Sequence, residues 1–304
     1  MPPSLLTLLL LTQPVVAPSS APPLAVPEYA VAFHRGDFPR ASALAGERLK
    51  ARPADVQARI VLARAEAAMG RLDAAYAGFR EALRLDPRSP DALYYLGIAA
   101  GALAEAEYGR LLEMAPASAR AHQLRGRSYE AQGRSAEAEA EYEAALEGHP
   151  APVEVRVALG DLTRSKVRFA DALAHYSRAA ELAPDNYDAN YGLGVCYSYG
   201  GEHTKAVEHF RRALRVVPDS AAARLALGIS LLQTGQTAAA VTELEAAARL
   251  EPRMRQAFYQ LGRAYQVLGR SQDAEAAFAR VQELIQQERQ FGEAQIREKQ
   301  SPPR

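Results

Sequence analysis

Residues 187–220 read YDANYGLGVCYSYGGEHTKAVEHFRRALRVVPDS, and this stretch decides the fold. Its proline, Pro218, and the preceding Pro184 are 34 apart. The same spacing separates the prolines at 53 and 87, and each neighbouring pair among those at 116, 150, 184, 218 and 252. A fixed period of this length is typical of a repeat protein.

Three positions of the repeat carry the same kind of residue in every unit. Position 8 is small: Ala63, Gly97, Gly126, Gly160, Gly194, Gly228 and Gly262. Position 20 is alanine: Ala75, Ala104, Ala138, Ala172, Ala206, Ala240 and Ala274. Position 24 is large: Phe79, Tyr108, Tyr142, Tyr176, Phe210, Leu244 and Phe278. Other apolar residues recur at helical spacing, so each unit is predicted to be two antiparallel helices that approach closely at the small residues. Gly194 and Ala206 are expected to face each other.

The pattern resembles the tetratricopeptide-repeat (TPR) family. That resemblance implies an all-α fold, a right-handed α-solenoid of helix-turn-helix repeats, in a protein that we expect to be bacterial. A single hairpin cannot bury its own apolar face, so neighbouring repeats must stack. The seven predicted repeats are residues 56–89, 90–118, 119–152, 153–186, 187–220, 221–254 and 255–286.

Three parts of the chain depart from the pattern. The repeat 90–118 is five residues short, since Pro87 and Pro116 are 29 apart, and the missing residues fall at the turn near Gly101. We expect a tightened turn between its two helices. Residues 22–55 keep mainly the second half of the pattern and are predicted to form a degenerate N-terminal cap. Residues 287–304 are predicted to extend the last helix as a C-terminal cap and to end in a mobile tail.

The N-terminus carries an apolar run, Leu5 to Thr12, followed by residues rich in proline, serine and alanine. A run of this length is typical of a signal peptide, which we place at residues 1–21, so the protein is expected to be periplasmic or secreted without an integral membrane span after processing. No lysine or arginine precedes the run, and proline follows both candidate cleavage sites. The alternatives are a cytoplasmic protein or an N-terminal membrane anchor.

Composition and motifs argue against several classes of function. Thirty-six basic and thirty-six acidic residues cancel, so the long-range positive field that nucleic acids require is missing. No nucleotide-binding, metalloprotease or serine-hydrolase motif occurs, so we expect no catalytic residue, cofactor or metal, and no enzyme. Cys196 occupies a position where other repeats carry small residues, which indicates packing. His175 and His209 share position 23 of adjacent repeats without the further ligands that a metal site needs.

The TPR resemblance places repeat positions 2, 5, 9, 12 and 13 on a concave groove lined by the first helices. Most residues at position 5 are apolar or aromatic, whereas several at position 9 are charged. The candidate groove residues are Tyr94, Arg127, Asp161, Tyr191, Val195, Tyr199, Leu225, Ile229, Tyr259 and Arg263. Such a surface suits a short amphipathic helix or an extended peptide of a protein partner. The alternative is that these side chains only pack between adjacent first helices.

The resemblance therefore implies a non-catalytic scaffold for protein–protein interaction in a bacterial cell-envelope assembly, with a membrane-associated complex as one candidate. The alternative function is that of an intracellular regulatory or targeting subunit of an enzyme complex. Chaperone-binding TPR domains hold a carboxylate with lysine and asparagine at positions 5 and 9, and this chain has neither residue there. A carboxylate clamp of that type is therefore not expected.

Overall fold

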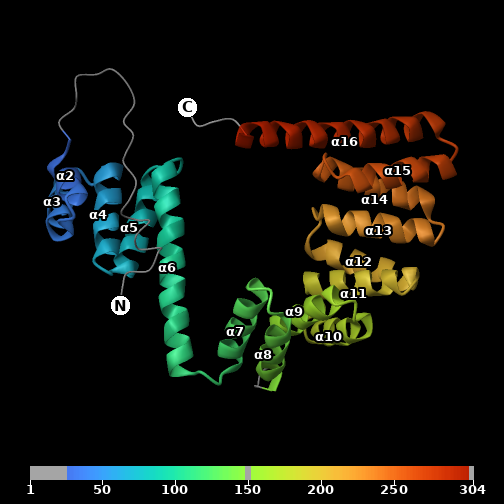
Figure 1. The fold of residues 1–304 in the computed structure, drawn as a ribbon, viewed down its shortest axis with the longest axis horizontal. Coiled ribbons are helices and arrows are strands. Elements are labelled where there is room, and N and C mark those ends of the chain that lie inside the picture. Colours follow the sequence, from blue (N-terminus) through green and yellow to red (C-terminus); the bar gives the residue numbers. More distant parts are fainter. Residues whose placement is uncertain (1–25, 148–151, 301–304) are drawn as a thin grey trace. The chain divides into compact units, whose positions relative to one another are not determined.

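The computed structural model describes residues 26–147 and 152–300, and over these residues the chain is α-helical without a strand (Figure 1). It divides into two compact units, Met1–Pro116 and Ala117–Arg304, here called unit 1 and unit 2. The signal peptide predicted at 1–21 and the tail 301–304 lie outside the described residues. The fold is an α-solenoid, as the repeat pattern predicts.

Unit 1 is a succession of helices in which each packs against the next. They are α2 (Glu28–His34), α3 (Phe38–Ala51), α4 (Val56–Ala68), α5 (Leu72–Leu85) and α6 (Pro90–Met114). The pair α2 and α3 occupies the predicted N-terminal cap, with a first helix of only seven residues. Phe33 and Ala41 of this pair are buried against α4, so the cap covers the apolar face of the first full repeat.

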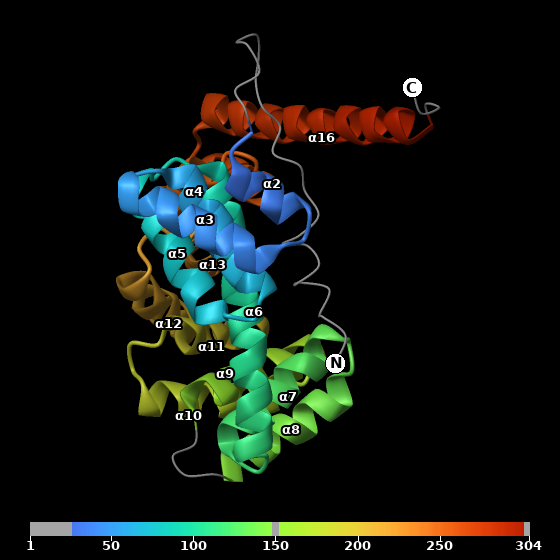
Figure 2. The same cartoon turned by 90° about the vertical axis from the view of Figure 1, so that its left-hand side faces the viewer.

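Unit 2 stacks five helical hairpins. Its helices are α7 (Ala119–Ala131), α8 (Ser135–Glu147), α9 (Val153–Ser165), α10 (Phe169–Leu182), α11 (Tyr187–Tyr199), α12 (His203–Val216), α13 (Ala221–Gln233), α14 (Thr237–Leu250), α15 (Arg255–Val267) and α16 (Ser271–Gln300). The two helices of each hairpin pack against each other, and Figure 2 shows this for α7 and α8. No described helix is both long enough and apolar enough to cross a membrane.

Short polar residues begin most of the first helices. The side chain of Ser220 accepts a hydrogen bond from the backbone N–H of Ala223, and Asn186 does the same for Ala189. Such caps satisfy one of the free N–H groups at a helix start. The prolines that set the period lie just before these caps, where the preceding helix has ended.

The turn inside each hairpin needs a residue with positive φ. Glycine supplies it in most hairpins, as at Gly201, where φ is 79°. In the hairpin of α9 and α10 the same place is taken by Val167, with a φ of 61°. A β-branched residue in this region is strained, so this turn is less favourable than the glycine turns around it.

The glycines at position 8 make room for the large residue at position 24. A Cβ added at Gly194 would lie 2.6 Å from the ring of Phe210, and one at Gly160 would lie 2.5 Å from the ring of Tyr176. The side chain nearest to a Cβ at Gly194 would be that of Phe210, and Ala206, which is predicted to face Gly194, is also fully buried. In unit 2 the two helices of a hairpin therefore interlock where a large side chain packs on a glycine, and that side chain is an aromatic ring except for Leu244 on Gly228.

The prediction of a tightened turn in the repeat 90–118 is wrong. Residues 90–114 form one uninterrupted helix, α6, which passes through Gly101 without a turn (Figure 1). The deletion removes the positive-φ residue and the connecting residues, and the sequence from Ala102 to Glu107 is rich in good helix formers. The first and second helices of this repeat are therefore fused.

The last helix extends well beyond its repeat, as predicted. Helix α16 runs from Ser271 to Gln300. Leu284, which follows Phe278 at position 24 of the last repeat, is buried. Ile285 is half-buried next to it. Burial of apolar residues in this extension is what a terminal cap requires.

Candidate functional site

The predicted groove residues lie in different environments. Tyr94 is exposed on α6, in unit 1, and the other nine lie on first helices of unit 2. Those exposed in unit 2 are Arg127, Tyr199, Tyr259 and Arg263. Those half-buried are Asp161, Tyr191, Val195 and Ile229, whereas Leu225 is buried.

The apolar and aromatic residues of the predicted groove, here called the apolar stripe, are Tyr191, Val195, Tyr199, Leu225, Ile229 and Tyr259, and the central part of this stripe packs against the core. Tyr191, Val195 and Ile229 contact the buried cluster that contains Phe210 and Leu225. The ring of Tyr191 stacks on Tyr187, with centroids 5.8 Å apart, and lies equally far from the ring of Phe210. Inter-repeat packing therefore accounts for much of the surface of these side chains, which is the alternative that the sequence left open.

Two aromatic residues of the stripe keep free surface. Tyr199 is 70% exposed and stacks on Phe169 at the hairpin turn, with centroids 4.0 Å apart. Tyr259 is 48% exposed and touches the edge of Phe278. Aromatic side chains that are held in place yet exposed are common anchors in protein interfaces.

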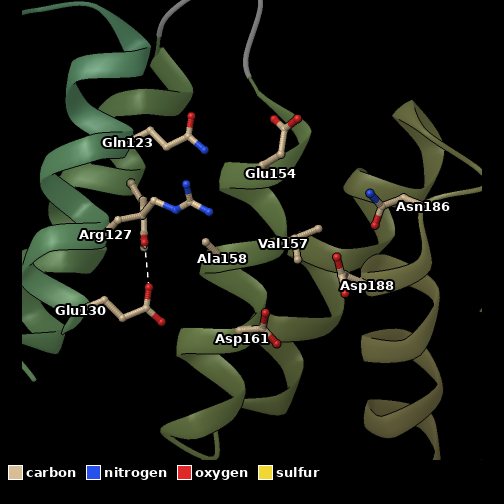
Figure 3. A pocket seen from close by; sticks show the side chains of 10 residues that line it. Gln123, Arg127, Glu130, Glu154, Val157, Ala158, Asp161, Asn186 and Asp188 are labelled. Atoms are coloured by element: carbon tan, nitrogen blue, oxygen red, sulfur yellow. Dashed lines mark hydrogen bonds between the residues drawn. The ribbon is translucent and has the colours of Figure 1, made fainter. Parts of the chain in front are cut away.

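A polar pocket of about 270 Å³ lies beside the stripe, on the first helices of three consecutive repeats (Figure 3). Helix α7 contributes Gln123, Arg127 and Glu130, and α9 contributes Glu154, Val157, Ala158 and Asp161. Tyr142 of α8, Asn186 and Asp188 complete the lining. Two of the predicted groove residues, Arg127 and Asp161, therefore meet in one concave site.

Two of the carboxylates in the pocket are held by tyrosines of the hairpin core. The hydroxyl of Tyr142 donates to Glu130 at 2.8 Å, and that of Tyr176 donates to Asp161 at 2.7 Å. Burial, and next the hydrogen bond to a carboxylate, raises the pKa of both tyrosines. Arg164 also donates to Asp161, at 3.1 Å. In these two hairpins the ring at position 24 thus also orients a negative charge on the groove side.

Asp188, in the first turn of α11, is the carboxylate of the pocket that has no arginine or tyrosine partner. No described residue forms an ion pair or a hydrogen bond with its side chain. Partial desolvation, together with the nearby charge of Asp161, raises the pKa of Asp188. Four carboxylates and one guanidinium, that of Arg127, line the pocket, and two of the carboxylates are paired with arginines beside it, Asp161 with Arg164 and Glu154 with Arg120. Asp188 is therefore the group of this site that can attract a further cation.

Family models for tetratricopeptide repeats match the chain over most of its length. One model matches residues 157–221, 197–242 and 225–288, and a second matches 56–99 and 119–162. The chain belongs to the tetratricopeptide-repeat family. Members of this family bind protein partners through their repeats, so a role in protein–protein interaction follows for this TPR chain.

Solved structures of MamA share the TPR fold. A crystal structure of MamA is 22% identical and covers 54% of this chain and 96% of its own, with a TM-score of 0.51. MamA from residue 41 to its end, from Desulfovibrio magneticus RS-1, is 17% identical and covers 56% and 96%, with a TM-score of 0.53. No curated protein matches the chain. At these identities the likeness establishes the fold alone.

The remaining candidate groups for chemistry have structural places in the TPR core. Cys196 is 4% exposed, and burial raises its pKa to about 11, so its reactive thiolate is scarce at neutral pH. His209 stacks on Tyr197 and shares a hydrogen bond with Asn190. Within residues 26–147 and 152–300 no three histidine, cysteine or acidic side chains gather as metal ligands would.

The sequence also holds two features that the groove prediction missed. Glu154 and Asp188 occupy position 2 and Glu130 position 12, both of which the TPR resemblance assigns to the groove. Their common negative charge was the signal for the pocket. Arg64 occupies position 9 but is only 1% exposed, because its guanidinium lies between the rings of Phe33 and Tyr95.

Proposed function

We propose that unit 2 holds a segment of a partner protein on its first helices, with a lysine or arginine of that segment in the acidic pocket. The observation that carries the proposal is the pocket itself, in which Asp188 has no cation among the described residues and lies close to Asp161. A bound cation would relieve the repulsion between these two carboxylates. The cation would also replace the hydration that the two carboxylates lose when the partner binds.

The size of the pocket favours a side chain over a small molecule. Small-molecule sites usually measure about 300 to 1,000 Å³ and are mostly apolar. The pocket is smaller, at about 270 Å³, and is lined by polar groups from three repeats. The exposed rings of Tyr199 and Tyr259 lie on later first helices of the same unit and offer apolar anchors to the rest of the segment.

Photo-cross-linking tests the site and does not require an identified partner. With benzoylphenylalanine at Gln123, the full chain in native extract is expected to capture a partner, whereas the same residue at Glu143 on the outer helix α8 is not. Asp188→Lys is expected to lower the captured yield tenfold or more, because a charge reversal repels the basic side chain. Glu143→Lys is the matched control, since it changes the net charge equally at an exposed position away from the pocket.

Acidification should also weaken capture. The pKa of Asp188 is raised, so this carboxylate is neutralised at a higher pH than an ordinary aspartate, and the attraction for a cation is lost as the pH falls through that value. Asp188→Asn should bind more weakly at neutral pH and lose less on acidification. Equal capture by wild type and Asp188→Lys would place the binding surface elsewhere.

We further propose that the protein works in the bacterial cell envelope. The support is the apolar run from Leu5 to Thr12 and its proline-rich continuation, which lie outside the described residues. The mature protein from its source is expected to begin between about residues 18 and 27, as determined by mass spectrometry of its N-terminal peptide. Intact Met1 in a cytoplasmic fraction would favour the alternative, an intracellular regulatory or targeting subunit.

A further inference from the structure

Helix α6 lacks the contact that closes the hairpins of unit 2. In those hairpins a Cβ at the glycine of position 8 would meet the side chain of position 24 at about 2.5 Å, as Gly126 would meet Tyr142. At Gly97, the glycine of the fused repeat, a Cβ would meet no described atom within 4 Å. Helix α6 therefore has space above Gly97 for a large side chain, here called the seat, and no described side chain fills it.

The side chain that would fill this seat lies on the same helix. Tyr108 occupies position 24 of the fused repeat and is 49% exposed, whereas its equivalents Tyr142 and Tyr176 are fully buried. Gly97 and Tyr108 are three turns of helix apart in the sequence, which places them about 16 Å from each other along the helix axis. They cannot meet while α6 is continuous.

The seat and the tyrosine belong to one continuous face. Residues at spacings of three or four share a side of a helix, and this side of α6 carries Leu93, Gly97, Ala100, Ala104, Tyr108 and Leu111. Each of these residues is exposed or half-buried. The other side of the first half, with Ala92, Tyr95 and Ala99, is buried in unit 1. The face is therefore an apolar surface that the rest of unit 1 leaves open at Leu93, Gly97 and Tyr108.

We propose that this face binds the same face of a second copy of the chain, with the two α6 helices antiparallel. In that arrangement Tyr108 of each copy is seated on Gly97 of the other, and the small residues Ala100 and Ala104 meet near the two-fold axis. Each copy then supplies the second helix that the fused repeat of the other lacks. The surface is self-complementary, as an interface with two-fold symmetry requires.

The pattern on α6 identifies a second copy as the occupant, because the seat and the ring that fills it are both on this helix. The same pairing closes the hairpins of unit 2, where the glycine and the large side chain come from one chain. Shortening the connection between two helices is a known route to the exchange of elements between copies. The shortened connection here is the five-residue deletion between Pro87 and Pro116.

Light scattering after size-exclusion chromatography of the full chain tests the proposal. The wild type is expected to have twice the mass of one chain, and Gly97→Leu is expected to have the mass of one, because leucine fills the seat. Gly109→Leu is the matched control, since Gly109 lies on another side of the same helix and its Cβ would also meet nothing within 4 Å. It should remain a dimer. Unchanged far-UV circular dichroism would show that both variants are folded.

Cross-linking through single cysteines identifies the surface. In a Cys196→Ala background, Ala104→Cys is expected to be joined to its copy by a short bismaleimide, and Ala106→Cys, on the opposite side of α6, is not. A single cysteine cannot be joined within one chain, so a product reports two copies. A wild type with the mass of one chain would overturn the proposal, as would equal yields at residues 104 and 106.

Discussion

Replacing Gly194 with leucine is expected to lower the free energy of unfolding by about 3 kcal/mol or more. Even the first atom of the new side chain would lie 2.6 Å from the ring of Phe210. That ring is 1% exposed and packs in the core shared with α13 and α14, so it has no free volume to move into. The helices α11 and α12 would have to separate, which disturbs the neighbouring hairpins as well.

Denaturant unfolding of the full chain measures this cost, and Gly109→Leu provides the control. The control makes the same substitution inside helix α6 at an open position and should raise stability by about 0.5 to 1 kcal/mol, because leucine favours a helix more than glycine does. Gly194→Ala is expected to fall between the two, since its Cβ alone already meets the ring. Equal stability of Gly194→Leu and wild type would mean that the hairpins do not interlock through position 8.

The repeat 56–89 shows how an alanine is accommodated at position 8. Ala63 occupies that position, and the facing residue at position 23 is Gly78, where an added Cβ would lie 2.8 Å from the Cβ of Ala63. The small residue has moved from one helix to the other, so the close approach is kept. Close helix contact, and not glycine as such, is therefore what the repeat pattern preserves.

Local rules explain why the hairpins could be predicted from the sequence. Glycine at the turn, a short polar cap and a small residue opposite a large one each act within a single repeat, so a pattern such as that around Gly201 and Ser220 is sufficient. The continuous helix α6 could not be predicted from these rules, because the sequence there is compatible with a short turn and with a continued helix. The deletion at Gly101 suggests a shorter turn, but without a positive-φ residue the backbone satisfies its hydrogen bonds by continuing the helix.

The groove was only partly predictable because burial depends on neighbours outside the repeat. Tyr191 and Leu225 occupy the same position 5 as Tyr259, yet the first two pack against core residues and Tyr259 keeps half of its surface. The sequence position of each residue fixes the helix face, but the size of adjacent side chains decides how much of it stays open. The acidic pocket, by contrast, follows from charges at positions 2, 9 and 12 that a repeat alignment places together.

Arg64 shows the strongest effect of neighbours outside the repeat. Its position, 9, predicts an exposed groove residue, but Phe33 of the preceding helical pair and Tyr95 of the following repeat lie on either side of it. The guanidinium carbon lies 4.3 Å from the centroid of the Phe33 ring and 4.5 Å from that of Tyr95. Burial lowers the pKa of this guanidinium, which nevertheless stays charged at neutral pH.

Arg64→Ala is therefore expected to lower the stability of unit 1 by about 3 kcal/mol. The change removes a side chain that fills the space between two rings, together with two cation–π contacts that are strong because they are shielded from water. Arg64→Met keeps much of the volume and avoids the desolvation of a charge, so it should cost about 1 kcal/mol. Arg263→Ala, at the same repeat position but exposed, should be nearly neutral.

Hydrogen exchange of the full chain separates this local effect from global unfolding. In a solenoid each repeat contacts only its neighbours, so Arg64→Ala should accelerate amide exchange in α2 to α6 and leave α11 to α14 unchanged. Gly194→Leu should give the opposite distribution. If Arg64→Ala and Arg64→Met were equally destabilising, charge and not packing would hold the cap on the first repeat. If neither changed exchange in α2 and α3, the sandwich between Phe33 and Tyr95 would contribute nothing to attaching the cap.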